Sequence, residues 1–274
     1  MFPGLRFTLL IPLAAILGCG VTPTPATTTS PSLSLSGNWM AIAPATPSTP
    51  PITLPTPIAE FTGALQFSGN AVTGTLRAFD PEFPNQCVSM TQDLPVSGTL
   101  DASNKLTLVV PISGGTATIT ATLGTNSETY TNGTWQIVGG ACAMPVTSIV
   151  IAHYAPVTGT YAGTLNTFDI TTLTIVPGTA TAITAVLTQS TAPNADGQFP
   201  LTDTIIATGA CSGNFTIANE AVSGGAITPI SSLTNPQTAF LDGVIEPTAT
   251  SIVAGFSGLA ACNWQVYQGT LTRQ

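Results

Sequence analysis

Five cysteines are the residues of this sequence whose type and spacing point most directly to chemistry. Two thiols can be oxidised to a disulfide, a bond that persists in exported proteins and is rare in the cytosol. Cys142 follows Cys87 by 55 residues and Cys262 follows Cys211 by 51, whereas Cys19 stands alone near the N-terminus. Of the three pairings that four cysteines allow, this spacing predicts Cys87–Cys142 and Cys211–Cys262 and leaves Cys19 for other chemistry.

The segment before Cys19 has the composition of an export signal. Residues 7–17 form an apolar run of eleven residues, with Arg6 ahead of it and Gly18 behind it. A helix that spans a bilayer needs about 20 apolar residues. The run therefore predicts a signal-peptide core and not a transmembrane helix.

The four residues Ile16, Leu17, Gly18 and Cys19 resemble the lipobox of bacterial lipoproteins. The resemblance implies that residues 1–18 are removed, that Cys19 is lipidated, palmitate included, and that the lipid holds the protein in a membrane of the cell envelope. Gly20 stands where Asp would resemble an inner-membrane retention signal, which favours the outer membrane over the plasma membrane. The alternative is an ordinary secretory peptide cut after Gly20, with Cys19 discarded.

Composition limits the classes of partner. Charged residues make up 6% of the chain, with four Lys and Arg against twelve Asp and Glu and a net charge of −8. Nucleic-acid binding needs clustered basic side chains, so it is not expected. The mean hydropathy is +0.41, but beyond residue 20 the apolar residues alternate with Thr, Ser and Gly. Outer-membrane barrels also alternate; the lipobox and the lack of aromatic girdles argue against that class.

The chain after the signal divides into a tether and two similar halves. Residues 19–32 are rich in Pro and Thr and lack apolar periodicity, which predicts an extended tether. Residues 33–156 and 157–274 are each expected to be one β-domain. Alternating patterns predict strands at 33–43, 61–67, 72–78, 87–100, 105–112, 116–123, 130–138 and 147–154, and then at 158–166, 180–188, 201–208, 212–219, 221–230, 239–245, 250–258 and 263–272.

The halves match as an internal repeat. Gly37-Asn38-Trp39 corresponds to Gly159-Thr160-Tyr161, and the first cysteine follows each glycine by 50 and 52 residues, respectively. Local pairing of consecutive strands predicts an all-β fold of two tandem antiparallel meander barrels of about eight strands each. Two β-sandwiches of similar strand count are the alternative.

A Gly-x-Trp on the first strand resembles the calycin barrels, the lipocalin and avidin kind. In that family the tryptophan closes one end of the barrel, and an Arg of the last strand can stack on it. The resemblance places Arg273 opposite Tyr161, whereas the first half offers His153 and Tyr154 there. It also implies an apolar ligand in the barrel, with Trp39 and Tyr161 as candidate contacts.

Catalytic and metal-binding patterns are missing from the sequence. His153 is the only histidine, and there is no G-x-S-x-G segment to present a nucleophile. Zinc sites need several closely spaced Cys or His ligands, and Asp80 with Glu82 offers too few oxygens for Ca²⁺. No spacing brings a carboxylate pair to one face among Asp80, Glu82, Asp93, Asp101 and Glu128. We therefore expect no enzyme, no metal and no cofactor.

Trp39, Trp135 and Trp264 are the remaining candidates for recognition, because an exposed aromatic ring can stack on a sugar or an apolar ligand. The leading expectation is a lipid-anchored envelope protein whose two β-domains act as a non-catalytic interaction or structural module. A carrier of a small apolar ligand and a carbohydrate-binding protein are the alternatives, and another envelope protein is the third kind of partner left open.

Overall fold

The computed structural model describes residues 35–43, 59–79, 93–112, 115–124, 129–140, 143–169, 171–229, 239–258, 262–263 and 265–274. Residues 33–274 belong to one compact unit. Cys19, Asp80, Glu82, Cys87, Glu128, Cys142 and Trp264 lie outside the described residues, so the expectations about them stay predictions. Among the described residues, no helix is long and apolar enough to cross a membrane.

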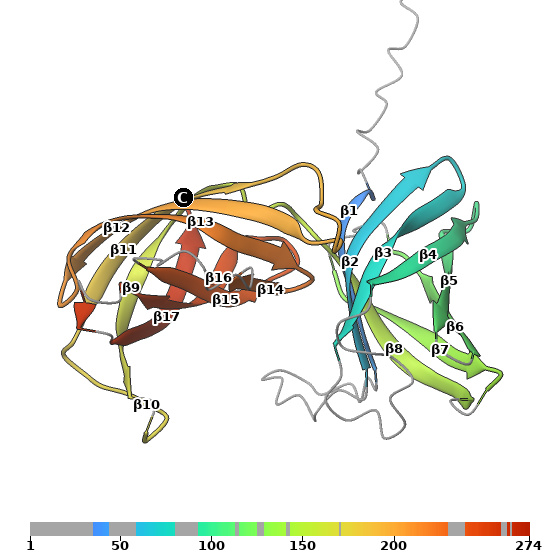
Figure 1. Ribbon diagram of the computed structural model, residues 1–274, viewed down its shortest axis with the longest axis horizontal. Coiled ribbons are helices and arrows are strands. Elements are labelled where there is room, and N and C mark those ends of the chain that lie inside the picture. The colour runs from blue at the N-terminus through green and yellow to red at the C-terminus, as the bar shows by residue number, and fades with distance from the viewer. Residues whose placement is uncertain are drawn as a thin grey trace, which may run out of the picture. The chain divides into compact units, whose positions relative to one another are not determined.

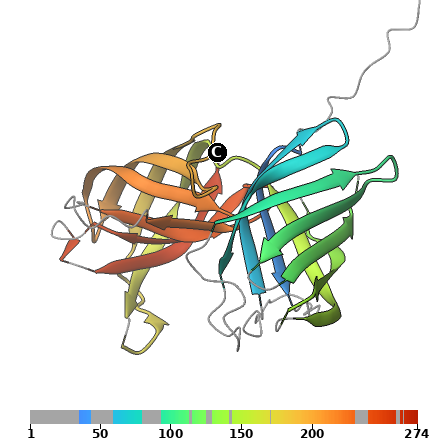
Figure 2. The same cartoon turned by 45° about the vertical axis from the view of Figure 1, so that its right-hand side comes forward.

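The first eight strands form a closed barrel (Figures 1 and 2). Each strand pairs antiparallel with the next one along the chain, and β1 also pairs with β8. The strands are β1 (Gly37–Ala43), β2 (Ala59–Ser68), β3 (Ala71–Phe79), β4 (Asp93–Leu100), β5 (Lys105–Ile112), β6 (Gly115–Thr122), β7 (Thr131–Val138) and β8 (Met144–Tyr154).

The remaining strands form a second closed barrel. Pairing between β9 and β17 closes eight of them, and the two-residue β10 pairs with the far end of β9 in a hairpin (Figure 1). The strands are β9 (Gly159–Asp169), β10 (Thr174–Ile175), β11 (Thr181–Gln189), β12 (Phe199–Gly209), β13 (Gly213–Ser223), β14 (Ala226–Pro229), β15 (Phe240–Ile245), β16 (Ser251–Ser257) and β17 (Val266–Arg273).

This topology confirms the all-β fold of two antiparallel meander barrels. The sandwich alternative is wrong, because pairing of the first strand with the last leaves each sheet without the open edges of a sandwich. Gly69 and Asn70 form the turn that joins β2 to β3, and Gly69 has φ of +58°, which glycine adopts without steric cost.

One expected turn is misplaced. The sequence pattern predicts a break between residues 219 and 221, whereas β13 continues through Glu220 to Ser223 and the chain reverses at Gly224 and Gly225. Gly224 has φ of +55°. The two glycines permit the reversal, and they leave Glu220 inside the strand as a buried residue.

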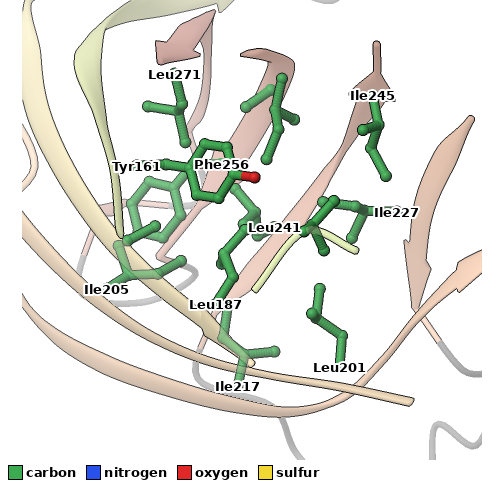
Figure 3. Packing of buried hydrophobic residues seen from close by; sticks show 14 of the residues in the cluster. Tyr161, Leu187, Leu201, Ile205, Ile217, Ile227, Leu241, Ile245, Phe256 and Leu271 are labelled. Carbon is green, nitrogen blue, oxygen red and sulfur yellow. The ribbon is translucent and has the colours of Figure 1, made fainter. Parts of the chain in front are cut away.

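Alternation of side chains builds each core. On β12, Leu201, Asp203, Ile205 and Ala207 are buried, while the intervening residues 202, 204 and 206 are exposed. Successive side chains of a strand point to opposite faces, so the first set lies inside the barrel. Figure 3 shows Leu201 and Ile205 among the apolar side chains that fill this interior, with Leu187, Ile217 and Leu241 from three other strands of the barrel.

Hydrogen bonds also connect the first barrel to the β13–β14 turn. The Asn38 side-chain amide donates to the Gly224 carbonyl at 2.8 Å, and its oxygen accepts from the Gly224 N–H at 2.7 Å. The Ser223 hydroxyl donates to the Thr62 hydroxyl oxygen at 2.8 Å. Asn38 is buried, so these contacts form a polar joint between β1 and the second barrel.

Candidate functional site

Trp39 and His153 lie at corresponding positions of the paired strands β1 and β8. The two residues are direct partners in the register, and their ring centroids are 5.0 Å apart. The Trp39 side chain is 1% exposed, and its indole N–H donates to the Leu35 carbonyl at 2.8 Å. Burial lowers the pKa of His153 to about 4, against a smaller opposite effect of the Ser36 backbone. The group is therefore a packed, neutral cluster.

Tyr161 and Arg273 repeat this arrangement in the second barrel. They are register partners on β9 and β17, and the Tyr161 ring is fully buried with its hydroxyl donating to the Ala249 carbonyl at 2.7 Å. Arg273 donates to the Thr158 carbonyl at 2.6 Å. Burial raises the pKa of Tyr161, and the charge of Arg273 partly offsets this effect.

The structure thus places the two candidate ligand contacts within the protein interior. The faces of Trp39 and Tyr161 do not lie on the surface, and Trp135 is buried as well. In the described part of the chain, tryptophan rings are therefore core residues rather than exposed stacking platforms. The role of Trp39 and Tyr161 as ligand contacts stays a prediction.

The second predicted disulfide is present. Cys211, between β12 and β13, is bonded to Cys262, which lies between β16 and β17. Both cysteines are buried. The bond closes a loop across 51 residues of the second barrel.

Asp203 and Glu220 form a pair of buried acids that was not among the candidate residues of the sequence analysis. Asp203 is 2% exposed and Glu220 is fully buried. On the neighbouring strands, Asp203 lies opposite Leu187 and Ile217. The carboxyls therefore lie in an apolar environment inside the second barrel.

The oxygens of this pair lack hydrogen-bond donors. Glu220 Oε1 accepts the Leu241 N–H at 2.6 Å, while Glu220 Oε2 and both Asp203 oxygens have no hydrogen-bond partner among the described residues. Each acid alters the pKa of the other, so the two carboxyls lie near each other. Ionised carboxylates only accept hydrogen bonds, so a hydrogen bond between the two acids forms only when one of them carries a proton.

Burial is the main cause of the altered acidity of both groups. It raises the pKa of Glu220 strongly, and the hydrogen bond and negative charge of Asp203 raise it further. Burial also raises the pKa of Asp203, while the hydrogen bond from Glu220 lowers it. The two groups titrate together, and the form with a single shared proton extends into the neutral range.

Asp101 and Asp93, two of the acids considered in the sequence analysis, have structural partners. Asp101 accepts hydrogen bonds from Ser103 and Lys105 in the β4–β5 turn. Asp93 is paired with Arg77 at 2.9 Å. Among the described residues, no group of three or more His, Cys, Asp or Glu side chains is arranged to hold a metal.

The sequence does contain a signal for Asp203 but not for its partner. Asp203 shares the inward phase of Leu201 and Ile205, which predicts a buried acid. The register between β12 and β13 shifts between Leu201 and Asp203, and this irregularity changes the alignment of the strand that carries Glu220.

No protein-family model, curated protein or solved structure matches the chain.

Proposed function

We propose that the chain is a lipid-anchored protein of the cell envelope whose two barrels form a non-catalytic interaction or structural module. The lipid on Cys19 anchors the chain in the membrane, and residues 19–32 form an extended tether that holds the barrels away from it. The two barrels present a stable surface for interaction. The lipobox resemblance supports the anchor, and the disulfide between Cys211 and Cys262 is consistent with the same compartment.

The filling of the barrels is the observation that favours this module over a carrier. An eight-stranded barrel is just wide enough for its own side chains or for one small ligand. The largest fully buried side chains include Trp39, Phe61 and Trp135 in the first barrel, and Tyr161 and Phe256 in the second. These aromatic rings occupy volume that a ligand would need.

The Thr-rich exterior supports a role in the envelope without catalysis. Strand positions that face outward carry Thr at 202, 204 and 216, with few charges between them. Both carboxyls of the buried acid pair lie inside the barrel, out of reach of a substrate on the surface. The proposal therefore assigns no reaction to the chain.

Lipid anchoring is tested by expressing the full chain in a bacterium with two membranes. The mature N-terminus, measured by mass spectrometry, should begin at lipidated Cys19, and the protein should partition into the detergent phase. Cys19→Ser should abolish both results. Gly20→Asp is the matched control, since it should keep the lipid and move the protein to the inner membrane. An unlipidated wild-type protein would refute the anchor.

The carrier and the carbohydrate-binding alternatives are tested on the same purified protein. Native mass spectrometry should show the mass of the polypeptide and its lipid alone, and an apolar fluorescent probe should show no saturable binding. A co-purified small molecule, or probe binding lost in Trp39→Phe or Tyr161→Phe, would favour a carrier. Retention on polysaccharide that a tryptophan substitution removes would favour glycan binding.

A further inference from the structure

We propose that Asp203 and Glu220 form a proton-dependent lock inside the second barrel, which stabilises the β13–β14 region in acid and weakens as the pH rises. The inference depends on neither the lipid anchor nor the proposed function. In the part of the chain that the structure describes, neither of these two buried acids has a positively charged partner.

The second half of the chain offers almost no positive charge. Arg273 is the only Lys, Arg or His in residues 157–274, and its guanidinium donates to the Thr158 carbonyl. A buried carboxylate without a cation or several hydrogen-bond donors is costly, because the protein interior does not replace its hydration. A shared proton is the remaining way to stabilise the pair.

The surrounding strands add no compensating group. Leu187 on β11, Ile217 on β13 and Leu201 on β12 are apolar. Gln189 on β11 is buried, but its side-chain oxygen accepts the Val157 N–H. Strand β14 carries no ionisable residue. On β15 the Leu241 N–H donates to Glu220, whereas Asp242 contributes a negative charge that further disfavours a second ionisation.

The position of Glu220 determines which part of the barrel the lock controls. Its side chain accepts a hydrogen bond from the N–H of Leu241, the second residue of β15, and its own strand continues three residues to the turn at Gly224. Loss of the shared proton leaves two negative charges facing each other inside the barrel. Repulsion then acts between β12, which carries Asp203, and β13, which carries Glu220, and a displacement of Glu220 also affects β15 through the Leu241 hydrogen bond.

The sign of the pH effect follows from the raised pKa values. In the unfolded chain both carboxyls lose their protons above about pH 4, whereas the folded barrel keeps at least one of them. Above about pH 4, and up to the pH at which the folded pair loses its last proton, the folded state binds more protons than the unfolded chain. The free energy of unfolding therefore falls as the pH rises through this range. For one proton the unfolding equilibrium constant changes by up to about tenfold per pH unit.

The experiment measures thermal unfolding and hydrogen exchange of the full chain between pH 5 and pH 8. We expect peptides that cover β13–β15 to exchange faster at pH 8, after correction for the intrinsic pH dependence of exchange. The double variant Asp203→Asn/Glu220→Gln, whose amides can still hydrogen-bond each other, should lose this difference. The matched control Glu246→Gln, which neutralises an exposed acid of the same barrel, should keep it.

A second measurement covers the case in which the double variant fails to fold. The infrared spectrum of the wild-type protein at pH 7 should contain the carbonyl band of a protonated carboxylic acid, and the difference spectrum against Glu220→Gln should show its loss. A protonated-acid band that is unchanged in this variant, or exchange in β13–β15 that does not depend on pH, would overturn the proposal.

A cation bound between the two carboxylates would be the alternative to the shared proton. The same unfolding experiment is therefore repeated with Ca²⁺ and with a chelator. We expect the melting temperature to be the same in both. A Ca²⁺-dependent increase that the double variant lacks would show that the acids hold a metal ion in place of the proton, and it would overturn the lock.

Discussion

Trp39 and His153 are paired across β1 and β8, and Tyr161 and Arg273 hold the same two positions on β9 and β17. Each barrel therefore joins its first strand to its last with an aromatic residue opposite a nitrogen-rich side chain. In the first barrel the partner is a buried imidazole, and in the second it is an exposed guanidinium. The equivalence extends the repeat from sequence spacing to the closure of the fold.

We predict that His153 destabilises the first barrel in acid. Its pKa is about 4 in the folded protein and about 6.5 in an unfolded chain. Below pH 6.5 the unfolded chain binds a proton that the folded barrel does not, so the free energy of unfolding decreases by an amount on the order of 3 kcal/mol on reaching pH 4.

The measurement is urea unfolding of the wild type and of His153→Gln between pH 4 and pH 7. The variant should lose part of the decrease in stability, because glutamine does not titrate. The raised pKa of Glu60 acts in the opposite direction, so the comparison between variants isolates the histidine. An identical pH profile in both proteins would contradict the assignment.

The glycines at the start of each repeat give a matched pair of substitutions. Gly37 has φ of +148° and Gly159 has φ of +150°, and an added Cβ would lie 3.0 Å from His153 Nε2 or Arg273 Nε. Ala is strained at both positions. Arg273 is exposed and can move aside, whereas His153 is buried. Gly37→Ala should therefore lower the free energy of unfolding by about 1 kcal/mol more than Gly159→Ala, measured with urea. Equal losses would show that the neighbouring side chain has no influence.

Removal of the disulfide should weaken the second barrel. The chain-entropy relation gives about 4 kcal/mol for a loop of this length, so Cys211→Ala/Cys262→Ala should shift urea unfolding of this barrel to lower concentration. Peptide mapping of the same variant should still find Cys87 bonded to Cys142, as the sequence spacing predicts. Cys87 and Cys142 recovered as free thiols in this variant would contradict the predicted pairing.

Sequence patterns captured the features that depend on short-range periodicity. Alternation in residues 201–208 predicts the strand and the burial of its odd positions, and the repeated cysteine spacing predicts the bond between Cys211 and Cys262. Contacts that depend on three-dimensional closure were not accessible. Asn38 bonds to Gly224 across 186 residues of sequence, and Glu220 meets Asp203 through a shift of register. Neither relationship leaves a local pattern.

The hydrogen bonds between Asn38 and Gly224 connect the first barrel to the turn that follows the strand of Glu220. Asn38→Ala removes one donor and one acceptor from Gly224, leaving both backbone groups buried without their partner. A loss of about 2 kcal/mol is expected.

If the joint couples the barrels, calorimetry of the wild type should give one transition and that of Asn38→Ala two. Thr122→Ser, a substitution at an exposed position of β6, serves as the control and should keep one transition. The pH dependence of exchange in β13–β15 should persist in Asn38→Ala, since the acids do not depend on the joint. A single transition in Asn38→Ala would show that the barrels are coupled by contacts other than this one.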